Sequence, residues 1–282
     1  MKAISLGAED REAALERLRP RARENLWLLD LVAGLGEPPL PAEGGAEVVG
    51  AVEARELRGV LALRPCVVAE SGLGAGGIDA FVPWIGSLRS GLLKCGVVEA
   101  DAIWSELRAL GRRAVVDRGE TSFALDRDVL EEIEPPPGAV VRRARSGDLP
   151  SLVHAARASL AEEGRPDPFD LDPDGFRRWV RSRTSRAIVC ESAGRVVFVG
   201  YADVQRAEGW LLQGVYTWPA ARRRGHARAG VSALCRAAFL AGASHVQLAV
   251  VAGNRAAERL YRGLGFRPFT TLRTVLFEPG DA

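Results

Sequence analysis

The sequence has few cysteines, few lysines and no long apolar run, and each shortage excludes a class of protein. The four cysteines are widely spaced and form no CxxC pair, which excludes a disulfide-stapled scaffold. No stretch reaches the roughly 18 uninterrupted apolar residues that a membrane span needs. Glu9, Asp10 and Glu12 stand where a signal peptide would need an apolar core. We therefore expect a cytoplasmic protein with reduced, buried thiols.

Histidine is also scarce, and its positions offer neither a metal site nor a nucleophilic triad. His154, His226 and His245 form no pair at metal-ligand spacing, and none has a neighbouring serine or cysteine partner. Hydrophobic residues (47%) and charged residues (26%) are enough for a buried core and a soluble surface over 282 residues. The composition therefore predicts a folded protein of about two domains without a bound metal.

Charge is balanced overall, at +2, but it is unevenly distributed. Residues 1–137 hold 16 Lys and Arg against 23 Asp and Glu, whereas residues 138–282 hold 22 against 13. A basic second half suits an anionic ligand. Nucleic-acid binding is the weaker interpretation, because Lys2 and Lys94 are the only lysines and an arginine-rich composition also follows genome bias. We expect neither nucleic acid nor a membrane among the partners.

Three consecutive prolines within residues 131–138 predict a short, stiff linker, since proline cannot continue a helix. We expect an N-terminal α/β domain over residues 1–134 and a second domain over residues 138–282. Helices are predicted at 9–34, 78–88 and 100–110 of the first half, and strands within 57–69 and at 121–126. In the second half the patterns predict strands at 139–143, 187–191, 196–204, 210–217, 246–251 and 271–277. Helices are expected at 148–160, 176–183, 225–241 and 256–264, which gives a mixed α/β layout in the order β-α-α-β-β-β-α-β-α-β.

The most informative segment, residues 217–228, joins a strand to the following helix. The first N–H groups of a helix have no internal partner and lie at the positive end of its dipole. Gly225 and Ala227 leave the backbone open to a phosphate. The segment suits a pyrophosphate, and an ordinary turn with solvated arginines is the alternative.

A second signal, N-x-x-A-x-x-L-Y-x-x-L-G-F, occupies residues 254–266. Its spacing places Ala257, Leu260 and Leu264 on one helical face, toward the sheet. Asn254 and Tyr261 lie about two turns apart, on the side that could meet a ligand. The alternative is that Tyr261 is a core residue with its hydroxyl pointing outward.

Together these segments resemble the signatures of GCN5-related N-acetyltransferases, the GNAT superfamily. Arg222-x-x-Gly225-x-Ala227 is similar to the acyl-CoA pyrophosphate loop, and the likeness covers roughly residues 139–278. Segments 24–29, 96–99, 103–104, 162–164 and 213–217 extend the resemblance to tandem acetyltransferases with an uncharacterised N-terminal domain. The resemblance implies a C-terminal acyl-CoA N-acyltransferase (GNAT) fold, preceded by a degenerate GNAT-like copy. A monomer with pseudo-dimeric halves fits this arrangement, and the oligomeric state stays open.

The resemblance also implies an activity: transfer of acetyl from acetyl-CoA to a primary amine by direct attack. Tyr261 would be the general acid that protonates the departing thiolate. A backbone N–H near Val215 would hold the oxyanion. Asn254 would bond the pantetheine arm. The implied cofactor-binding residues are Val215, Tyr216, Thr217, Arg222, Arg223, Arg224, Gly225, His226, Ala227, Arg228 and Asn254.

The sequence departs from the superfamily at the general base. Many relatives carry a glutamate on the central strand, but residues 210–214 contain no carboxylate. Gln213 cannot accept a proton, although it could orient a water. The identity of the general base is therefore open. A non-catalytic acyl-CoA sensor or scaffold is the alternative function.

The acceptor is expected beside the loop between the first two helices of the second domain, as is common in this superfamily. This loop carries acids that would attract a cationic amine: polyamine-like, aminoglycoside-like, a lysine side chain or a peptide N-terminus. Glu162, Glu163 and Gln213 are the candidate substrate residues. The alternative is that the acids cap helices and form turns with the prolines. The acids are Glu162, Glu163, Asp167, Asp170, Asp172 and Asp174.

Residues 72–77 fit G-x-G-x-x-G, and Glu99 lies 22 residues beyond Gly77, near the acid position of dinucleotide-binding folds. However, Arg64-Pro65 interrupts the preceding apolar run, and the first half has too few strand–helix alternations for a doubly wound sheet. A nucleotide-dependent oxidoreductase is thus the less favoured alternative. We expect residues 72–77 to be either a degenerate copy of the pyrophosphate loop or merely a flexible segment.

Overall fold

The computed structural model describes residues 1–38, 45–169 and 172–280. Contacts divide the chain into two compact units. The N-terminal unit comprises Met1–Ser122, Val250–Gly253 and Phe269–Ala282, and the C-terminal unit comprises Phe123–Ala249 and Asn254–Pro268. The division thus falls inside two long strands, β6 (Arg112–Asp126) and β12 (Arg267–Pro279), rather than at residues 131–138.

The proline-rich segment does not behave as a free linker. Ser232 Oγ donates to the carbonyl of Glu131 at 3.0 Å and accepts from the backbone N–H of Ile133 at 3.1 Å. These bonds tie the segment to a helix of the C-terminal unit. The domain limits 1–134 and 138–282 therefore stay a prediction, and the compact units are cut elsewhere.

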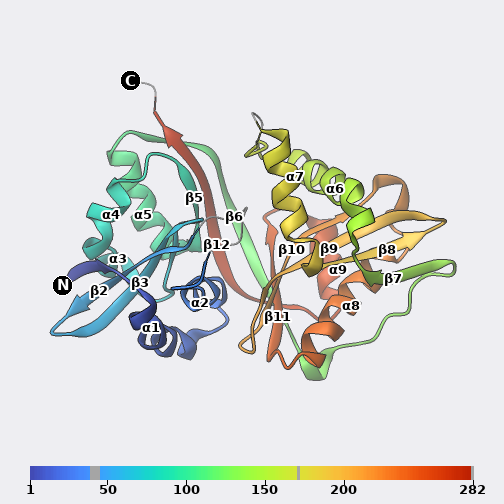
Figure 1. Cartoon of the computed structure of the whole chain (residues 1–282), viewed down its shortest axis with the longest axis horizontal. Coiled ribbons are helices and arrows are strands. Elements are labelled where there is room, and N and C mark those ends of the chain that lie inside the picture. The colour runs from blue at the N-terminus through green and yellow to red at the C-terminus, as the bar shows by residue number, and fades with distance from the viewer. Residues whose placement is uncertain (39–44, 170–171, 281–282) are drawn as a thin grey trace. The chain divides into compact units, whose positions relative to one another are not determined.

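The two halves of the chain have nearly the same order of elements (Figure 1). The first half contains β1 (Lys2–Ser5), α1 (Arg11–Leu18), α2 (Leu26–Ala33), β2 (Glu47–Glu53), β3 (Glu56–Arg64), β4 (Val68–Ala69), α3 (Gly74–Ile78), α4 (Val82–Gly86), β5 (Gly91–Gly96), α5 (Val97–Ala109) and β6. The second half contains β7 (Ala139–Arg143), α6 (Leu149–Glu162), α7 (Pro173–Ser182), β8 (Ala187–Ser192), β9 (Arg195–Gln205), β10 (Trp210–Thr217), α8 (His226–Leu240), β11 (His245–Val251), α9 (Arg255–Arg262) and β12. Helices α3 and α4 of the first half take the place of α8 in the second. The mixed α/β fold class is confirmed.

The N-terminal unit has an antiparallel sheet in the order β1-β2-β3-β4 and a second group in the order β5-β12-β6. Alternate residues of β2 and β3 face opposite sides, as the pleat requires. Val48 and Val60 pack with α1 and α2, whereas Val49 and Leu61 pack with α5. β12, from the other half of the chain, fills the place between β5 and β6.

The C-terminal unit orders its strands β6-β11-β10-β9-β8-β7. The β7, β8, β9 and β10 neighbours are antiparallel, and β10 pairs with β11 in parallel. Helices α6 and α7 cover one face, where Leu152, Phe176 and Tyr201 are buried together. Helix α8 covers the opposite face (Figure 1). A mixed sheet between two helical layers is the fold expected for the second half.

Several predicted elements differ in the first half. The helix expected at 9–34 is two helices, α1 and α2, separated by a 3-10 turn that contains Pro20. In place of one helix at 78–88, the chain forms two five-residue helices, α3 and α4, which are joined by a 3-10 turn. The strand expected at 121–126 is the end of the much longer β6. Charged residues along the first part of β6 hide its apolar alternation.

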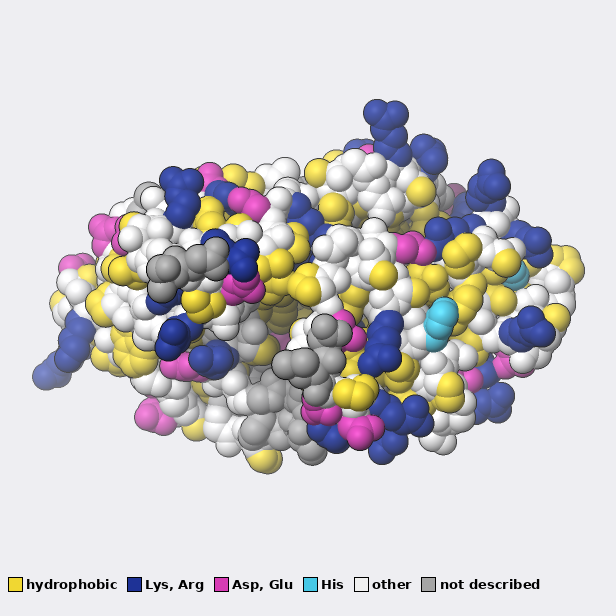
Figure 2. Space-filling model, turned by 90° about the horizontal axis from the view of Figure 1, so that it is seen from above, with side chains coloured by type: hydrophobic (Ala, Val, Ile, Leu, Met, Phe, Trp, Pro, Cys, Tyr) yellow, Lys and Arg dark blue, Asp and Glu magenta, His cyan; other side chains and the backbone are white. Residues whose placement is uncertain are grey.

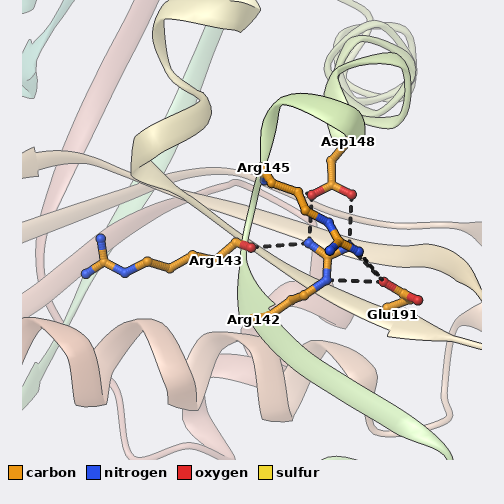
Figure 3. A network of polar contacts seen from close by, with 5 residues as sticks. All are labelled: Arg142, Arg143, Arg145, Asp148 and Glu191. Atoms are coloured by element: carbon orange, nitrogen blue, oxygen red, sulfur yellow. Dashed lines mark hydrogen bonds and ion pairs between the residues drawn. The ribbon is translucent and has the colours of Figure 1, made fainter.

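Arg142 fixes the start of α6 to the sheet (Figure 3). Its Nη1 and Nη2 atoms donate to the two carboxylate oxygens of Asp148 at 2.7 and 2.9 Å, and Nη2 also donates to Glu191 Oε2 at 2.7 Å. Asp148 occupies the N-cap position of α6, but its side chain makes no cap hydrogen bond to that helix. Instead it accepts from the backbone N–H of Arg145 at 2.8 Å. The carboxylate of Asp148 therefore bonds to Arg142 and to the 3-10 turn that precedes α6, and not to the helix itself.

Candidate active site

Strands β10 and β11 separate soon after they begin to pair. Their register contains only Trp210↔Val246 and Leu211↔Gln247, although β10 continues to Thr217. The register with β9 also shifts between Gln213 and Tyr216. Over residues 212–217, therefore, the described part of the chain supplies β10 with no strand partner on its β11 side. An extended ligand can add to such an edge through backbone hydrogen bonds.

Gly214 shapes this opening. Its φ is +57°, a conformation that side chains rarely adopt, and the residue is exposed. A Cβ there would lie 3.0 Å from Cδ2 of Tyr201 on β9. The glycine therefore allows a bulge directly above a buried tyrosine ring, and it turns the backbone of Val215 out of the regular ladder.

The loop after β10 leads into α8 at the end of this opening. Arg223 and Gly225 have φ values of +60° and +85°, and α8 begins at His226. Arg222, Arg223, Arg224 and Arg228 are all exposed. The first N–H groups of a 15-residue helix and several guanidinium groups thus share one loop. On the face in Figure 2, more basic than acidic side chains lie on the surface of the C-terminal unit.

The structure brings together two residues that were predicted for different roles. Arg222 Nη2 donates to Oε1 and Oε2 of Glu162 at 2.6 and 2.8 Å, and Arg222 Nε donates to the carbonyl of Thr217 at 2.9 Å. The guanidinium carbon lies 5.7 Å from the ring centroid of Tyr216. Glu162, expected at the acceptor, therefore contacts the loop expected to bind the cofactor.

His226 turns its side chain into the protein rather than toward a ligand. Its Nδ1 lies 3.6 Å from Sγ of Cys190, and both residues are buried. Burial, helped by the nearby charge of Arg224, lowers the pKa of His226. With a lowered pKa the buried imidazole adds no positive charge for an anion near pH 7, so we expect the backbone N–H of His226 to be the group that meets one.

Asn254 and Tyr261 lie at the start of α9 and near its end. Asn254 Oδ1 accepts from the backbone N–H of Ala257 at 3.1 Å and so caps the helix, which leaves Nδ2 as its donor for a ligand. Tyr261 is 6% exposed and packs edge-to-face on Phe266 with 5.7 Å between ring centroids.

Tyr261 is held in its neutral form. Burial raises the pKa of Tyr261, and the charge of Glu163 acts in the same direction. A phenol with a raised pKa stays protonated throughout the physiological range. The group is thus present as a proton donor, which is the state that the predicted general acid needs.

The acidic loop makes mostly local contacts. Asp172 caps α7 by accepting from the backbone N–H of Gly175 at 2.7 Å. Asp167 Oδ1 accepts from the backbone N–H of Phe169 at 2.8 Å, and Glu163 lies 3.9 Å from Arg165. Asp174 lies in the first turn of α7, and Asp170 lies outside the described residues. These contacts favour the alternative in which the acids cap and turn the chain.

An ion pair that the sequence analysis did not single out lies beside the β10 bulge. Arg183 is 8% exposed, and its Nε donates to Asp203 Oδ1 at 3.0 Å. Its guanidinium carbon lies 4.5 and 4.4 Å from the rings of Trp179 and Tyr201. Tyr201 is paired with Gln213 across the strands. An aspartate within the apolar run of β9 was the signal available in the sequence.

The glycine loop of the N-terminal unit is already occupied by a carboxylate of the chain. Glu99 Oε1 accepts from the backbone N–H groups of Gly72 and Gly74 at 3.0 and 3.2 Å, and Glu99 is 5% exposed. The helix that follows, α3, has only five residues. These features count against a dinucleotide site in this unit.

Comparisons with known proteins agree with this geometry. Residues 149–266 match the model of the acetyltransferase (GNAT) family. A Drosophila protein of known structure has a TM-score of 0.74 at 13% identity, with 97% of this chain and 98% of that one covered. A GCN5-related N-acetyltransferase from Sphaerobacter thermophilus scores 0.61 at 19% identity, covering 99% and 96%. A tandem GNAT protein from the clavulanic acid biosynthesis pathway scores 0.57 at 15% identity, covering 99% of each chain. A comparison with curated proteins gave no match.

Residues 149–266 therefore match the acetyltransferase (GNAT) family, and the whole chain shares the fold of a tandem GNAT protein. The predicted resemblance and the predicted fold are confirmed. In the described ranges we find no helix of the length and apolarity that crossing a bilayer requires, and no cluster of His, Cys, Asp and Glu suited to a metal ion.

Proposed function

We propose that the C-terminal unit transfers an acetyl group from acetyl-CoA to a primary amine. The family of residues 149–266 supports acyl transfer in general. The observation that carries the finer proposal is the opening between β10 and β11, with the start of α8 at its end. It offers backbone partners for an extended arm and, next to them, N–H groups and arginines for a pyrophosphate. The four free, buried cysteines suit a cytoplasmic enzyme.

The residues divide between two parts of acetyl-CoA. Backbone groups of Val215, Tyr216 and Thr217 would pair with the pantetheine arm, and Asn254 Nδ2 would donate to one of its carbonyls. The pyrophosphate would lie against the backbone N–H groups at the start of α8 and against the exposed guanidinium groups. The residues proposed for it are Arg222, Arg223, Arg224, Gly225, His226, Ala227 and Arg228.

The proposed reaction is a direct displacement. The amine nitrogen attacks the thioester carbonyl, a C–N bond forms, and the C–S bond breaks. The backbone N–H of Val215, at the bulge, would stabilise the oxyanion. Tyr261 would give its proton to the departing thiolate. The amine must lose a proton, and since β10 has no carboxylate, a water oriented by Gln213 is the proposed first acceptor.

Calorimetry with acetyl-CoA and a thiol-release assay test this proposal together. The amines are spermidine, kanamycin, L-lysine and a peptide with a free N-terminus, because these represent the acceptor classes that the acidic loop suggested. We expect acetyl-CoA to bind and at least one amine to release the thiol. Tight binding without release for any amine would instead support an acyl-CoA sensor or scaffold. Thermal stabilisation by NAD or FAD, with none by acetyl-CoA, would support an oxidoreductase.

A further inference from the structure

The guanidinium group of Arg222 is held along one edge. Thr217 accepts from Nε through its carbonyl, and Glu162 accepts from Nη2 through both carboxylate oxygens. These contacts leave Nη1 at the opposite edge. Arginine binds phosphate best when its planar group is already oriented, because little side-chain freedom is then lost on binding.

The helix that carries Glu162 is itself anchored. Glu162 is the last residue of α6, and Arg142 ties the start of this helix to β7 and β8 through Asp148 and Glu191 (Figure 3). Buried Leu149, Leu152 and Ala155 hold the same helix on the sheet. The carboxylate thus comes from a rigid element, which is what an orienting contact requires.

We infer that Glu162 is a positioning residue, which orients Arg222 for the pyrophosphate of acyl-CoA, and that it does not bind the acceptor. The inference rests on the proposed function. It reassigns Glu162 from the amine side of the reaction to the cofactor side. Glu162 acts through Arg222 and touches neither reactant, so its effect belongs to donor binding and not to the chemical step.

Two opposing effects decide whether Glu162 strengthens or weakens acyl-CoA binding, and by how much. A carboxylate near an anionic ligand repels it, which weakens binding, whereas orientation of Arg222 strengthens binding. The side chains of Arg222 and Glu162 are 41% and 48% exposed, and exposed pairs contribute at most about 1 kcal/mol. Orientation therefore changes donor affinity by about fivefold or less. If Glu162 instead competed with the pyrophosphate for Arg222, its removal would tighten binding.

Glu162→Gln, compared with Glu163→Gln, separates orientation from charge. Both variants remove one negative charge from adjacent positions, but the ion pair of Glu163 is with Arg165 rather than Arg222. We expect E162Q to raise the KM for acetyl-CoA about two- to fivefold above that of E163Q, with kcat unchanged. The KM for S-acetylpantetheine, which has no pyrophosphate, should be the same in E162Q as in the wild type. In an R222Q background, E162Q should have no further effect on the KM for acetyl-CoA.

An equal KM for acetyl-CoA in E162Q and E163Q, or a lower one in E162Q, would overturn the inference. So would an E162Q effect that is as large with S-acetylpantetheine as with acetyl-CoA, or that persists in R222Q. These outcomes differ from failure of the proposed function, in which the wild-type chain binds no acetyl-CoA and transfers nothing.

Discussion

Tyr261 is the residue on which the proposed chemistry depends most. Its replacement by phenylalanine removes one oxygen from a ring that packs on Phe266 and leaves that packing in place. We expect Tyr261→Phe to lower kcat about 10²- to 10⁴-fold, the usual range for loss of a general acid, and to leave acetyl-CoA affinity nearly unchanged. Steady-state kinetics and calorimetry measure the two effects separately. An unchanged kcat would remove Tyr261 from the mechanism.

Asp148 carries a pH dependence of stability. The hydrogen bonds from Arg142, helped by the backbone N–H of Arg145, hold the pKa of Asp148 below its usual range against the effect of burial. A depressed folded pKa stabilises the protein above the unfolded pKa of about 3.9, and this contribution is lost as the pH falls through the folded value. Asp148→Asn should lower the free energy of unfolding by about 1–3 kcal/mol at pH 7, because the half-buried Arg142 loses one of its two carboxylate partners and keeps only Glu191.

Urea unfolding at pH 7 and at pH 3 checks this expectation. The difference in unfolding free energy between wild type and Asp148→Asn should be nearly constant above about pH 5. It should shrink toward pH 3, where the Asp148 carboxylate of the unfolded wild-type chain takes up a proton. A difference that stays the same down to pH 3 would show that the charge of Asp148 does not contribute.

At the level of elements, the second half could be predicted closely and the first half could not. β7 and β10 have the predicted bounds, because each is a short apolar strand with turn residues at its ends. In the first half β1, β2 and β5 were missed. β1 has four residues, and Lys94 interrupts the apolar alternation of β5. Charge and brevity hid these strands.

The candidate site, too, could be predicted from the sequence only in part. Motif spacing located the loop at Gly225 and the helix of Tyr261, because both depend on short-range geometry. The contact between Glu162 and Arg222 joins residues 60 positions apart, and the inward turn of His226 depends on Cys190, 36 positions away. No local pattern encodes such contacts, so the sequence could predict neither the partner of Glu162 nor the direction of the His226 side chain.

The two ends of α8 provide a matched test of the proposed phosphate loop. Gly225, before the helix, and Gly242, after it, have φ values of +85° and +89°. An alanine at either position adopts an unfavourable conformation at a cost of about 1–2 kcal/mol. A Cβ at Gly225 would also lie 3.2 Å from Cγ of Pro136, whereas a Cβ at Gly242 would meet nothing within 4 Å.

Both Gly225→Ala and Gly242→Ala should therefore lower the melting temperature, but only Gly225→Ala should weaken acetyl-CoA binding. We expect its Kd to rise at least about tenfold, since the contact of the new methyl group with Pro136 and the unfavourable φ would displace the backbone N–H groups proposed for the phosphate. Calorimetry gives the Kd values and a thermal melt gives the stability. Equal Kd values for the two variants would contradict the assignment of this loop.

For the molecule as a whole, the repeated fold raises the question of how many donor sites one chain has. The C-terminal unit offers the open β10 edge and the loop at Gly225. In the N-terminal unit the corresponding loop is filled by Glu99, and Val67, the residue before β4, forms a parallel bridge with Leu93 of β5. We therefore expect one acetyl-CoA per chain.

Glu99 should be structural under this account. Glu99→Ala removes the acceptor of two backbone N–H groups and should cost about 1.5–3 kcal/mol of unfolding free energy. It should leave the Kd for acetyl-CoA unchanged, because the donor site lies in the C-terminal unit. Glu99→Gln keeps one side-chain carbonyl oxygen and should cost less. Loss of acetyl-CoA binding in a folded Glu99→Ala protein would place the donor in the N-terminal unit.

Calorimetric titration of acetyl-CoA into the whole chain tests the central claim most directly, because it needs no knowledge of the acceptor. We expect saturable binding of one acetyl-CoA per chain. We also expect Gly225→Ala to weaken this binding and Gly242→Ala to leave it intact. No binding by the wild-type chain, or full binding by Gly225→Ala, would contradict the central claim.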